Sequence, residues 1–206
     1  RAWLDVALSV LLAPECAGCR QPLDRPTGGA VCLRCWAAVV APPFPCCDCC
    51  GDPLPRLFPR RCRRCTDFPP LVERTRSAGL HDGSLRQIVH ALKYDGRRSL
   101  AAPLAALMRE RDDGVLADAV AVVPVPLHWR RRLARGFNQA DDLARHLRRP
   151  VVHALARRGS TRSQADLSAI ERQQNVRGAF AATRHASPLS GRCVALIDDV
   201  TTQARR

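Results

Sequence analysis

Two adjacent carboxylates and two hydroxyls follow a short apolar run near the end of the sequence: Asp198, Asp199, Thr201 and Thr202 come after Val194-Ala-Leu-Ile197. Such a run is typical of a buried parallel strand, and open α/β sheets bind ligands where these strands end. Paired carboxylates accept hydrogen bonds from vicinal sugar hydroxyls, whereas hydroxyls and backbone amides at a helix start suit a phosphate. The pattern favours a site for a phosphorylated sugar. The alternative is a strand that ends in an Asx turn and binds nothing.

Cysteine pairs dominate the first third of the chain. Ten of the 11 cysteines lie between Cys16 and Cys65, and eight of them form four Cys-x-x-Cys pairs. Twelve residues separate the first two pairs and 11 separate the last two, the spacing of four-thiolate zinc ribbons. Zinc would replace the core that ~60 residues rich in proline and glycine cannot build. We predict two structural zinc sites, with these ligands: Cys16, Cys19, Cys32, Cys35, and Cys47, Cys50, Cys62, Cys65.

Two alternatives to structural zinc stay open at this point. A secreted disulfide framework is one, although a Cys-x-x-Cys loop is usually too tight for a structural disulfide. A redox role for the pairs is the other. The ligand register is also open, because Cys46 and Cys49 form an overlapping pair. Gly51 favours Cys47 and Cys50, since a turn after the pair commonly needs a residue free to adopt positive φ.

Positive charge is concentrated in the second part of the chain. The net charge is +14, and residues 76–206 carry 23 basic and 12 acidic side chains, so phosphorylated ligands or nucleic acid are the expected partners. Arg130, Arg131 and Arg132 follow an apolar run and are candidates for phosphate contacts with nucleic acid; a solvated helix face is the alternative. Aromatic residues make up 4% of the chain, so base-stacking platforms are expected to be scarce.

No apolar run approaches the roughly 20 residues that a membrane span needs. The opening stretch 3–12 is interrupted by Asp5 and lacks a small-residue cleavage site, so we expect an amphipathic helix there and a cytoplasmic location.

Strand and helix patterns alternate from residue 84 onward. We expect helices over 84–94 (with Ser84 as N-cap), 99–111 and from about 136, and strands over 119–125, 151–155 and 194–197. A short helix is expected to start at Ser168 and to end at Phe180. The intervening stretch 157–167 lacks periodicity and is expected to be a loop. Alternation of this kind predicts an α/β fold with a parallel, doubly wound sheet. We place a domain boundary after residue 75, beyond Pro69-Pro70.

In combination these stretches resemble the ComF family, phosphoribosyltransferase-like proteins associated with DNA uptake and competence, together with the related GntX-type proteins. The resemblance covers nearly the whole chain in the family's order. Its matching stretches are the double zinc ribbon of residues 16–65, His90-Ala-Leu-Lys93-Tyr94, Val123-Pro-Val-Pro-Leu-His128, Arg135-Gly-Phe-Asn-Gln139, the block from Thr161 to Asn175 with Phe180, and Ile197-Asp-Asp-Val200 with its threonines.

This resemblance implies a type I phosphoribosyltransferase-like fold and binding of phosphoribosyl pyrophosphate (PRPP) with Mg²⁺. The acid pair would hold the ribose hydroxyls, the threonines the 5′-phosphate, and the loop at 127–128 the pyrophosphate. Arg135 and the loop from Arg157 to Arg172 are the candidates to close over the departing anion. The implied PRPP-binding residues are Asp198, Asp199, Thr201, Thr202, Leu127, His128 and Arg135. It assigns no general base and no acceptor substrate.

The chain departs from the family pattern after Val200. The family has one further residue and then Thr-Thr-Gly-Ala-Thr, whereas this sequence continues Thr201-Thr202-Gln203 and lacks both the spacer and the glycine. Glutamine is unfavourable where close backbone approach or positive φ is needed. We expect weak PRPP binding. The rival hypotheses are a non-catalytic accessory protein that binds DNA, single-stranded DNA included, and an adaptor that docks a competence protein through its zinc ribbons.

Overall fold

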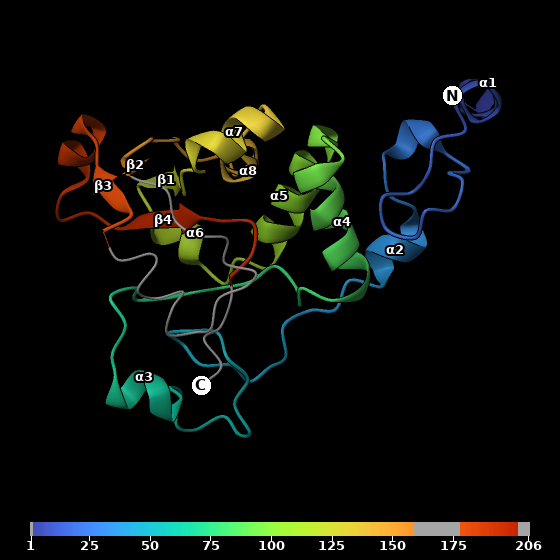
Figure 1. Cartoon of the computed structure of the whole chain (residues 1–206). Helices are drawn as coiled ribbons and strands as arrows, with labels where there is room; N and C mark the ends of the chain where they lie inside the picture. Colours follow the sequence, from blue (N-terminus) through green and yellow to red (C-terminus); the bar gives the residue numbers. More distant parts are fainter. Residues whose placement is uncertain (1, 159–177, 202–206) are drawn as a thin grey trace. The chain divides into compact units, whose positions relative to one another are not determined.

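The computed structural model describes residues 2–158 and 178–201 and has a mixed α/β fold (Figure 1). The chain divides into two compact units, residues 1–115 and 116–206. The domain boundary that the sequence predicts after residue 75 stays a prediction. None of the described helices is long and apolar enough to cross a membrane.

The first unit opens with helix α1 (Ala2–Leu12), as the sequence predicts. Asp5 is its buried polar residue and accepts a hydrogen bond of 2.8 Å from the Thr27 amide, which holds the pKa of this carboxyl below its ordinary value. Several apolar side chains of α1, among them Trp3 and Val10, are exposed instead.

Two similar ribbons follow α1. In each, an antiparallel bridge closes the turn around the first cysteine pair: Glu15 with Pro22, and Cys46 with Pro53. The second pair then opens a short helix, α2 (Leu33–Ala37) or α3 (Arg63–Asp67), with an extended cysteine as N-cap. Along the chain, the 3₁₀ turn η1 (Pro26–Gly28) precedes α2. The ribbons therefore repeat one local design.

The turn after the first pair of each ribbon needs positive φ. Gly51 has φ 75°, as the sequence predicts, and Arg20 has φ 62° at the equivalent place. A Cβ on Gly51 would also lie 2.9 Å from the Thr75 carbonyl oxygen. Glycine is thus required in the second ribbon both by its φ and by a close backbone approach.

Two longer helices complete the first unit. Helix α4 (Gly83–Tyr94) buries Leu85, Ile88 and Leu92 on one face, as their spacing predicts. The N-cap prediction was wrong: Asp82, not Ser84, accepts the Gly83 amide at 2.8 Å. The 3₁₀ turn η2 (Arg98–Leu100) leads into α5 (Ala101–Glu110).

The second unit contains a small parallel sheet. Strands β1 (Ala121–Pro124) and β4 (Val194–Ile197) pair in parallel, with Ala121 opposite Val194 and Pro124 opposite Ile197. A parallel bridge joins Val122 to Val151. All four residues of β1 are buried. A parallel sheet is therefore confirmed, whereas the phosphoribosyltransferase-like fold stays a proposal.

Two parts of the second unit differ from the sequence-based expectation. The strand expected over 151–155 begins later, as β2 (Leu155–Arg157), and pairs antiparallel with β3 (Phe180–Ala182). Phe180 thus starts a strand, where we expected it to end a helix. The helix expected from Ser168 lies outside the described residues.

Along the chain of the second unit, short helices precede and follow strand β1. The short α6 (Val115–Asp118) precedes β1, and α7 (Trp129–Arg135) and α8 (Gln139–Arg145) follow it. The 3₁₀ turn η4 (Arg184–Leu189) precedes β4. Helix α8 matches the prediction, with Asp141 and Asp142 in its first turn. Helix α7 was not among the predicted helices, although a solvated helix face was the alternative given for its arginines.

Candidate functional site

The eight paired thiols gather into two groups of four. Within each group the Sγ atoms lie within 4.8 Å of one another, and the groups are Cys16, Cys19, Cys32, Cys35 and Cys47, Cys50, Cys62, Cys65.

The Sγ separations fit a metal better than a disulfide. The Sγ atoms of Cys19 and Cys32 are 3.9 Å apart, and those of Cys50 and Cys62 are 3.7 Å apart. Four sulfurs placed tetrahedrally at about 2.3 Å from Zn²⁺ would lie about 3.8 Å from one another. A disulfide needs about 2.05 Å. All 11 cysteines are free thiols in this structure. The geometry is therefore suited to a four-thiolate zinc site.

Backbone amides prepare one thiol of each group for a metal. The amides of Gly18 and Cys32 lie 3.3 Å from Cys16 Sγ, and the Cys62 amide lies 3.3 Å from Cys47 Sγ. Burial alone would raise the pKa of these two thiols, but the amide hydrogen bonds outweigh it and lower the pKa of Cys16 and of Cys47 to about 6. Both thiols are thus available as thiolates near neutral pH, which is the form that binds zinc.

The remaining thiols of the groups behave differently. Burial, reinforced by hydrogen bonding to neighbouring thiols, raises the pKa of Cys35 to about 12. Burial also raises the pKa of Cys65 to about 11, and it raises the pKa of Cys50. A chain without metal would keep these three thiols protonated, so metal binding to either group would release protons.

Among the described residues, Cys46 and Cys49 lie outside both groups. Cys49 is buried, with its Sγ 3.4 Å from the Val72 carbonyl oxygen, and Cys46 takes part in the bridge to Pro53. The geometry therefore favours the register with Cys47 and Cys50 that Gly51 suggested. The assignment of all eight as zinc ligands stays a prediction.

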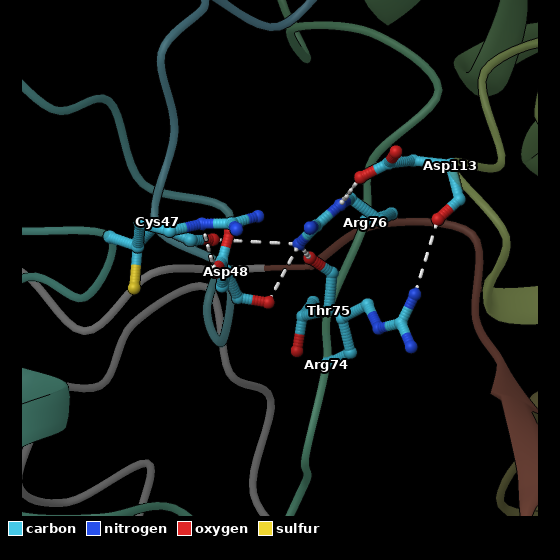
Figure 2. Close-up of polar contacts among 7 residues, drawn as sticks. Cys47, Asp48, Arg74, Thr75, Arg76 and Asp113 are labelled. Atoms are coloured by element: carbon cyan, nitrogen blue, oxygen red, sulfur yellow. Dashed lines mark hydrogen bonds and ion pairs between the residues drawn. The ribbon is translucent and has the colours of Figure 1, made fainter. Parts of the chain in front are cut away.

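Arg76 attaches the second ribbon to the segment after α5 (Figure 2). Its Nη1 lies 3.4 Å from the Cys47 carbonyl oxygen, 3.0 Å from that of Asp48 and 2.9 Å from that of Thr75. Its Nε donates to the Asp113 carboxylate at 2.9 Å. The side chain is 14% exposed. One guanidinium therefore joins the backbone beside a candidate metal ligand to a carboxylate 37 residues further along the chain.

The second candidate site lies at the carboxyl edge of the parallel strands. Because β1 and β4 run parallel and end level with each other, the residues that follow them leave the sheet at one edge. The Val125 amide extends this pairing by donating to the Ile197 carbonyl at 2.9 Å. The structure thus brings the loop 125–128 and Asp198 to the same edge, as their positions after two strands predict.

His128 and Asn138 fix the loop at this edge. The His128 Nδ1 accepts a hydrogen bond from the Arg130 amide at 3.3 Å and caps α7, and the His128 side chain is buried. The Asn138 amide group donates to the Val125 carbonyl at 3.0 Å, while its oxygen accepts from the Ala140 amide and caps α8. Between them Gly136 ends α7 in the left-handed conformation, with φ 75°. The stretch 136–138 therefore has a structural role: it ends α7 and holds the loop 125–128 at the end of β1.

Positive charge from two other elements reaches this edge. Arg157 of β2 is half-buried, and its burial lowers the pKa of its guanidinium. The charge of Arg131 on α7 lowers that pKa further, and the charge of Asp198 opposes the change. Arg157 therefore lies within electrostatic range of both Arg131 and Asp198. At the start of the loop the Asp199 amide donates to the Asp198 carboxylate at 2.8 Å.

The other predicted residues are placed as follows. Leu127 is partly buried in the loop, Arg135 is partly buried at the end of α7, and Thr201 is exposed. Thr202 lies outside the described residues. The resemblance names Arg157 only as the first residue of a loop that closes over the departing anion, whereas the structure places it in strand β2. Sequence reasoning missed Trp129, whose exposure no pattern indicated.

Comparison with curated proteins finds clear relatives. The chain is 35% identical over 204 residues to the DNA utilization protein YhgH of Salmonella typhimurium, covering 91% of this chain and 84% of the relative. It is 33% identical over 199 residues to the YhgH protein of Escherichia coli, with the same coverage. It is 30% identical over 198 residues to competence protein F of Haemophilus influenzae, covering 91% of this chain and 85% of that protein. No family model and no solved structure matches the chain. The identity and coverage, together with the order of the motifs, show that the chain belongs to the ComF family.

Proposed function

We propose that this chain acts in competence or DNA utilization, the roles that the names of its relatives state, by binding nucleic acid through helix α7. The observation that carries the proposal is the composition and exposure of this helix. It contains four arginines and no acidic residue, and Arg130, Arg131 and Arg132 are all exposed. Exposed arginines on one short helix suit the phosphates of a nucleic acid strand, single-stranded DNA included.

The salt dependence of binding tests this proposal. Three phosphate contacts on a single strand give a slope of about −2 in log affinity against log salt concentration, and changing the three arginines to alanine together should remove that contribution. The measurement is fluorescence anisotropy with a labelled oligodeoxynucleotide from 50 to 200 mM salt. We expect weaker binding on every sequence, because phosphates carry no sequence information.

A triple variant elsewhere controls for net charge. Arg34, Arg56 and Arg61 are exposed residues of the first unit, and their joint replacement by alanine removes the same charge. We expect this control to bind almost as the unchanged protein does. Equal loss in both variants would mean that only net charge matters, and unchanged binding in the α7 variant would remove this helix from the binding surface.

A second function is favoured by the meeting of Asp198 and the loop 125–128 at the carboxyl edge, with Arg157 in electrostatic range of Asp198. We propose that this edge binds a phosphorylated sugar of the PRPP type, with Mg²⁺ neutralising part of its charge. Carboxylates there would accept hydrogen bonds from ribose hydroxyls, and the arginines would balance the phosphates. In a transfer reaction, positive charge fixed before the reaction would stabilise departing pyrophosphate more than the bound ground state. This proposal assumes the phosphoribosyltransferase-like fold, which we propose with it.

We predict that PRPP binding is weak, because the loop after Val200 lacks the family's spacer and glycine. Loss of two charge-assisted phosphate contacts, each worth about 1.5 to 3 kcal/mol, lowers affinity roughly 10²- to 10⁴-fold. Titration calorimetry with PRPP and Mg²⁺ should show this. A variant with one residue inserted after Val200 and with Gln203→Gly should bind more tightly than the unchanged chain.

The same titration has a direct control. Asp198→Asn removes one ribose acceptor charge and should weaken binding by the repaired variant. Micromolar binding by the unchanged chain, lost in Asp198→Asn, would show that the short loop is competent. Heat in neither chain would count against PRPP as the ligand.

We also propose that the two thiol groups hold structural zinc. The support is their geometry: four Sγ atoms within 4.8 Å, spacings of 3.7–3.9 Å, and amide hydrogen bonds to the first thiol of each group. Zinc bound there would cross-link each ribbon, and the second ribbon has little else to bury. Its buried residues Cys47, Cys49 and Cys65 are packed with Leu54, Cys50 and Cys62.

A further inference from the structure

Helix α7 exposes a large aromatic side chain beside its arginines. Trp129, the first residue of the helix, is 59% exposed, and Leu133 one turn later is 75% exposed. Side chains four residues apart lie on one face of a helix, so these two share a face. A tryptophan normally buries most of its surface in a folded protein. Its exposure here leaves a flat apolar surface open to a partner.

A buried ring and a positively charged side chain lie next to Trp129. The ring of His128 lies 5.6 Å from the Trp129 ring, and His128 is itself buried and fixed by its hydrogen bond from the Arg130 amide. The Arg130 guanidinium lies 5.2 Å from the centre of the Trp129 ring. The Trp129 indole thus lies next to a buried, fixed histidine ring. The Arg130 guanidinium beside it can bind a phosphate.

A second arginine–aromatic pair belongs to the same unit. The Arg157 guanidinium of β2 lies 5.4 Å from the ring centre of Phe180, which is on the neighbouring strand β3. The charge of Arg131 on α7 acts on that of Arg157. This unit therefore contains two arginine–aromatic pairs, one on α7 and one formed by β2 and β3.

We propose that Trp129 stacks on a base of a single-stranded nucleic acid whose phosphates are held by the neighbouring arginines, with Phe180 as a second platform. The inference rests on the proposed binding of nucleic acid and adds to it a preference for strands whose bases are unpaired. Aromatic rings next to cations are what single strands require, because every base presents a flat face and every linkage a negative charge. In a duplex the faces of the bases are stacked on one another and closed to the indole. Charge complementarity favours this occupant over an uncharged protein surface.

The test compares two strands that differ only in their bases. One is a 20-residue oligodeoxythymidine and the other an abasic strand of the same length, which keeps the phosphates. The unchanged protein should bind the thymidine strand more tightly by roughly 5- to 150-fold, the range for stacking on one base. Trp129→Ala should abolish this difference and leave abasic binding unchanged. Trp129→Phe should keep part of it.

A second readout follows the indole directly. In a variant with Trp3→Phe and Trp36→Phe, Trp129 is the remaining tryptophan. Its fluorescence should be quenched by the thymidine strand and little affected by the abasic strand. Arg130, Arg131 and Arg132 changed to alanine should weaken binding to both strands by the same factor, because these residues contact phosphates.

The outcomes separate this inference from the proposed function. Equal binding of both strands by the unchanged protein would overturn the stacking role and leave nucleic-acid binding intact. Binding of neither strand would overturn both. Thymidine binding that survives Trp129→Ala would overturn the role of this residue. Trp129-dependent binding to anionic phosphatidylglycerol vesicles, without a difference between the strands, would assign the surface to a membrane instead.

Discussion

Replacing Cys47 by serine should remove one of two zinc ions from the chain and unfold the second ribbon. Structural zinc contributes an apparent binding free energy of about 10–16 kcal/mol in small zinc modules, far more than the few apolar contacts of this ribbon can supply. Cys47 is fully buried and receives an amide hydrogen bond, so no solvent-exposed thiol can take its place easily. Metal analysis should fall from two zinc ions per chain to about one. Hydrogen exchange should show lost protection over residues 47–65 and retained protection in α4.

Cys46→Ser is the matched control, because Cys46 lies next to Cys47 but outside the thiol group. It should keep two zinc ions. Loss of zinc in Cys46→Ser with retention in Cys47→Ser would show that the overlapping pair supplies the ligands. Protein purified without added zinc that contains none, with disulfides found by mass spectrometry, would contradict the zinc assignment altogether.

Arg76→Leu should strongly destabilise the first unit. The substitution removes the donor for three carbonyl oxygens and the Asp113 carboxylate. Loss of a mostly buried charged donor costs about 2 to 4 kcal/mol, because its acceptors must find water or remain without a donor. Thermal unfolding followed by circular dichroism is the measurement. The second ribbon should also give up zinc to a chelator at a lower concentration, since two of the carbonyls belong to Cys47 and Asp48.

Two further variants give this prediction its controls. Arg76→Lys keeps the charge but not the planar group that reaches several acceptors at once, so most of the loss should remain. Asp113→Ala removes only the carboxylate, which is 68% exposed, and should cost less than about 1 kcal/mol. A stability of Arg76→Leu within experimental error of the unchanged protein would mean that these hydrogen bonds exchange for water without loss.

The elements with regular apolar spacing were predictable. Helix α4 buries Leu85, Ile88 and Leu92 at helical spacing, and β1 is apolar throughout and buried throughout. Helix α7 was not predictable in this way, because the described structure buries none of its residues. The helix begins after the His128 cap and ends at Gly136, so each end depends on one residue and not on a repeated pattern. Strands β2 and β3 are three residues long and pair across more than 20 residues, so no local pattern indicates them.

The candidate sites divide in the same way. The cysteine pairs could be grouped from their spacing, because two short loops determine which pairs can meet. The choice of Cys47 and Cys50 over the overlapping pair also needed the signal from Gly51. The part played by Arg76 could not be predicted, since it depends on carbonyls near residue 47 and a carboxylate at residue 113 meeting in space. Trp129 could not either: its type favours burial, and only the structure shows that it is exposed.

The two ribbons share a local design but differ in the accessibility of their thiols. In the first group Cys19 is exposed, whereas every thiol of the second group is buried or partly buried. A chelator or an oxidant attacks a metal–thiolate centre through its most accessible sulfur, so the kinetic order of metal exchange follows thiol exposure rather than binding strength. Under oxidative or metal-poor conditions the first ribbon would therefore lose its ion sooner. The chain would pass through a state with a single metal ion, in which the ribbon secured by Arg76 is still folded.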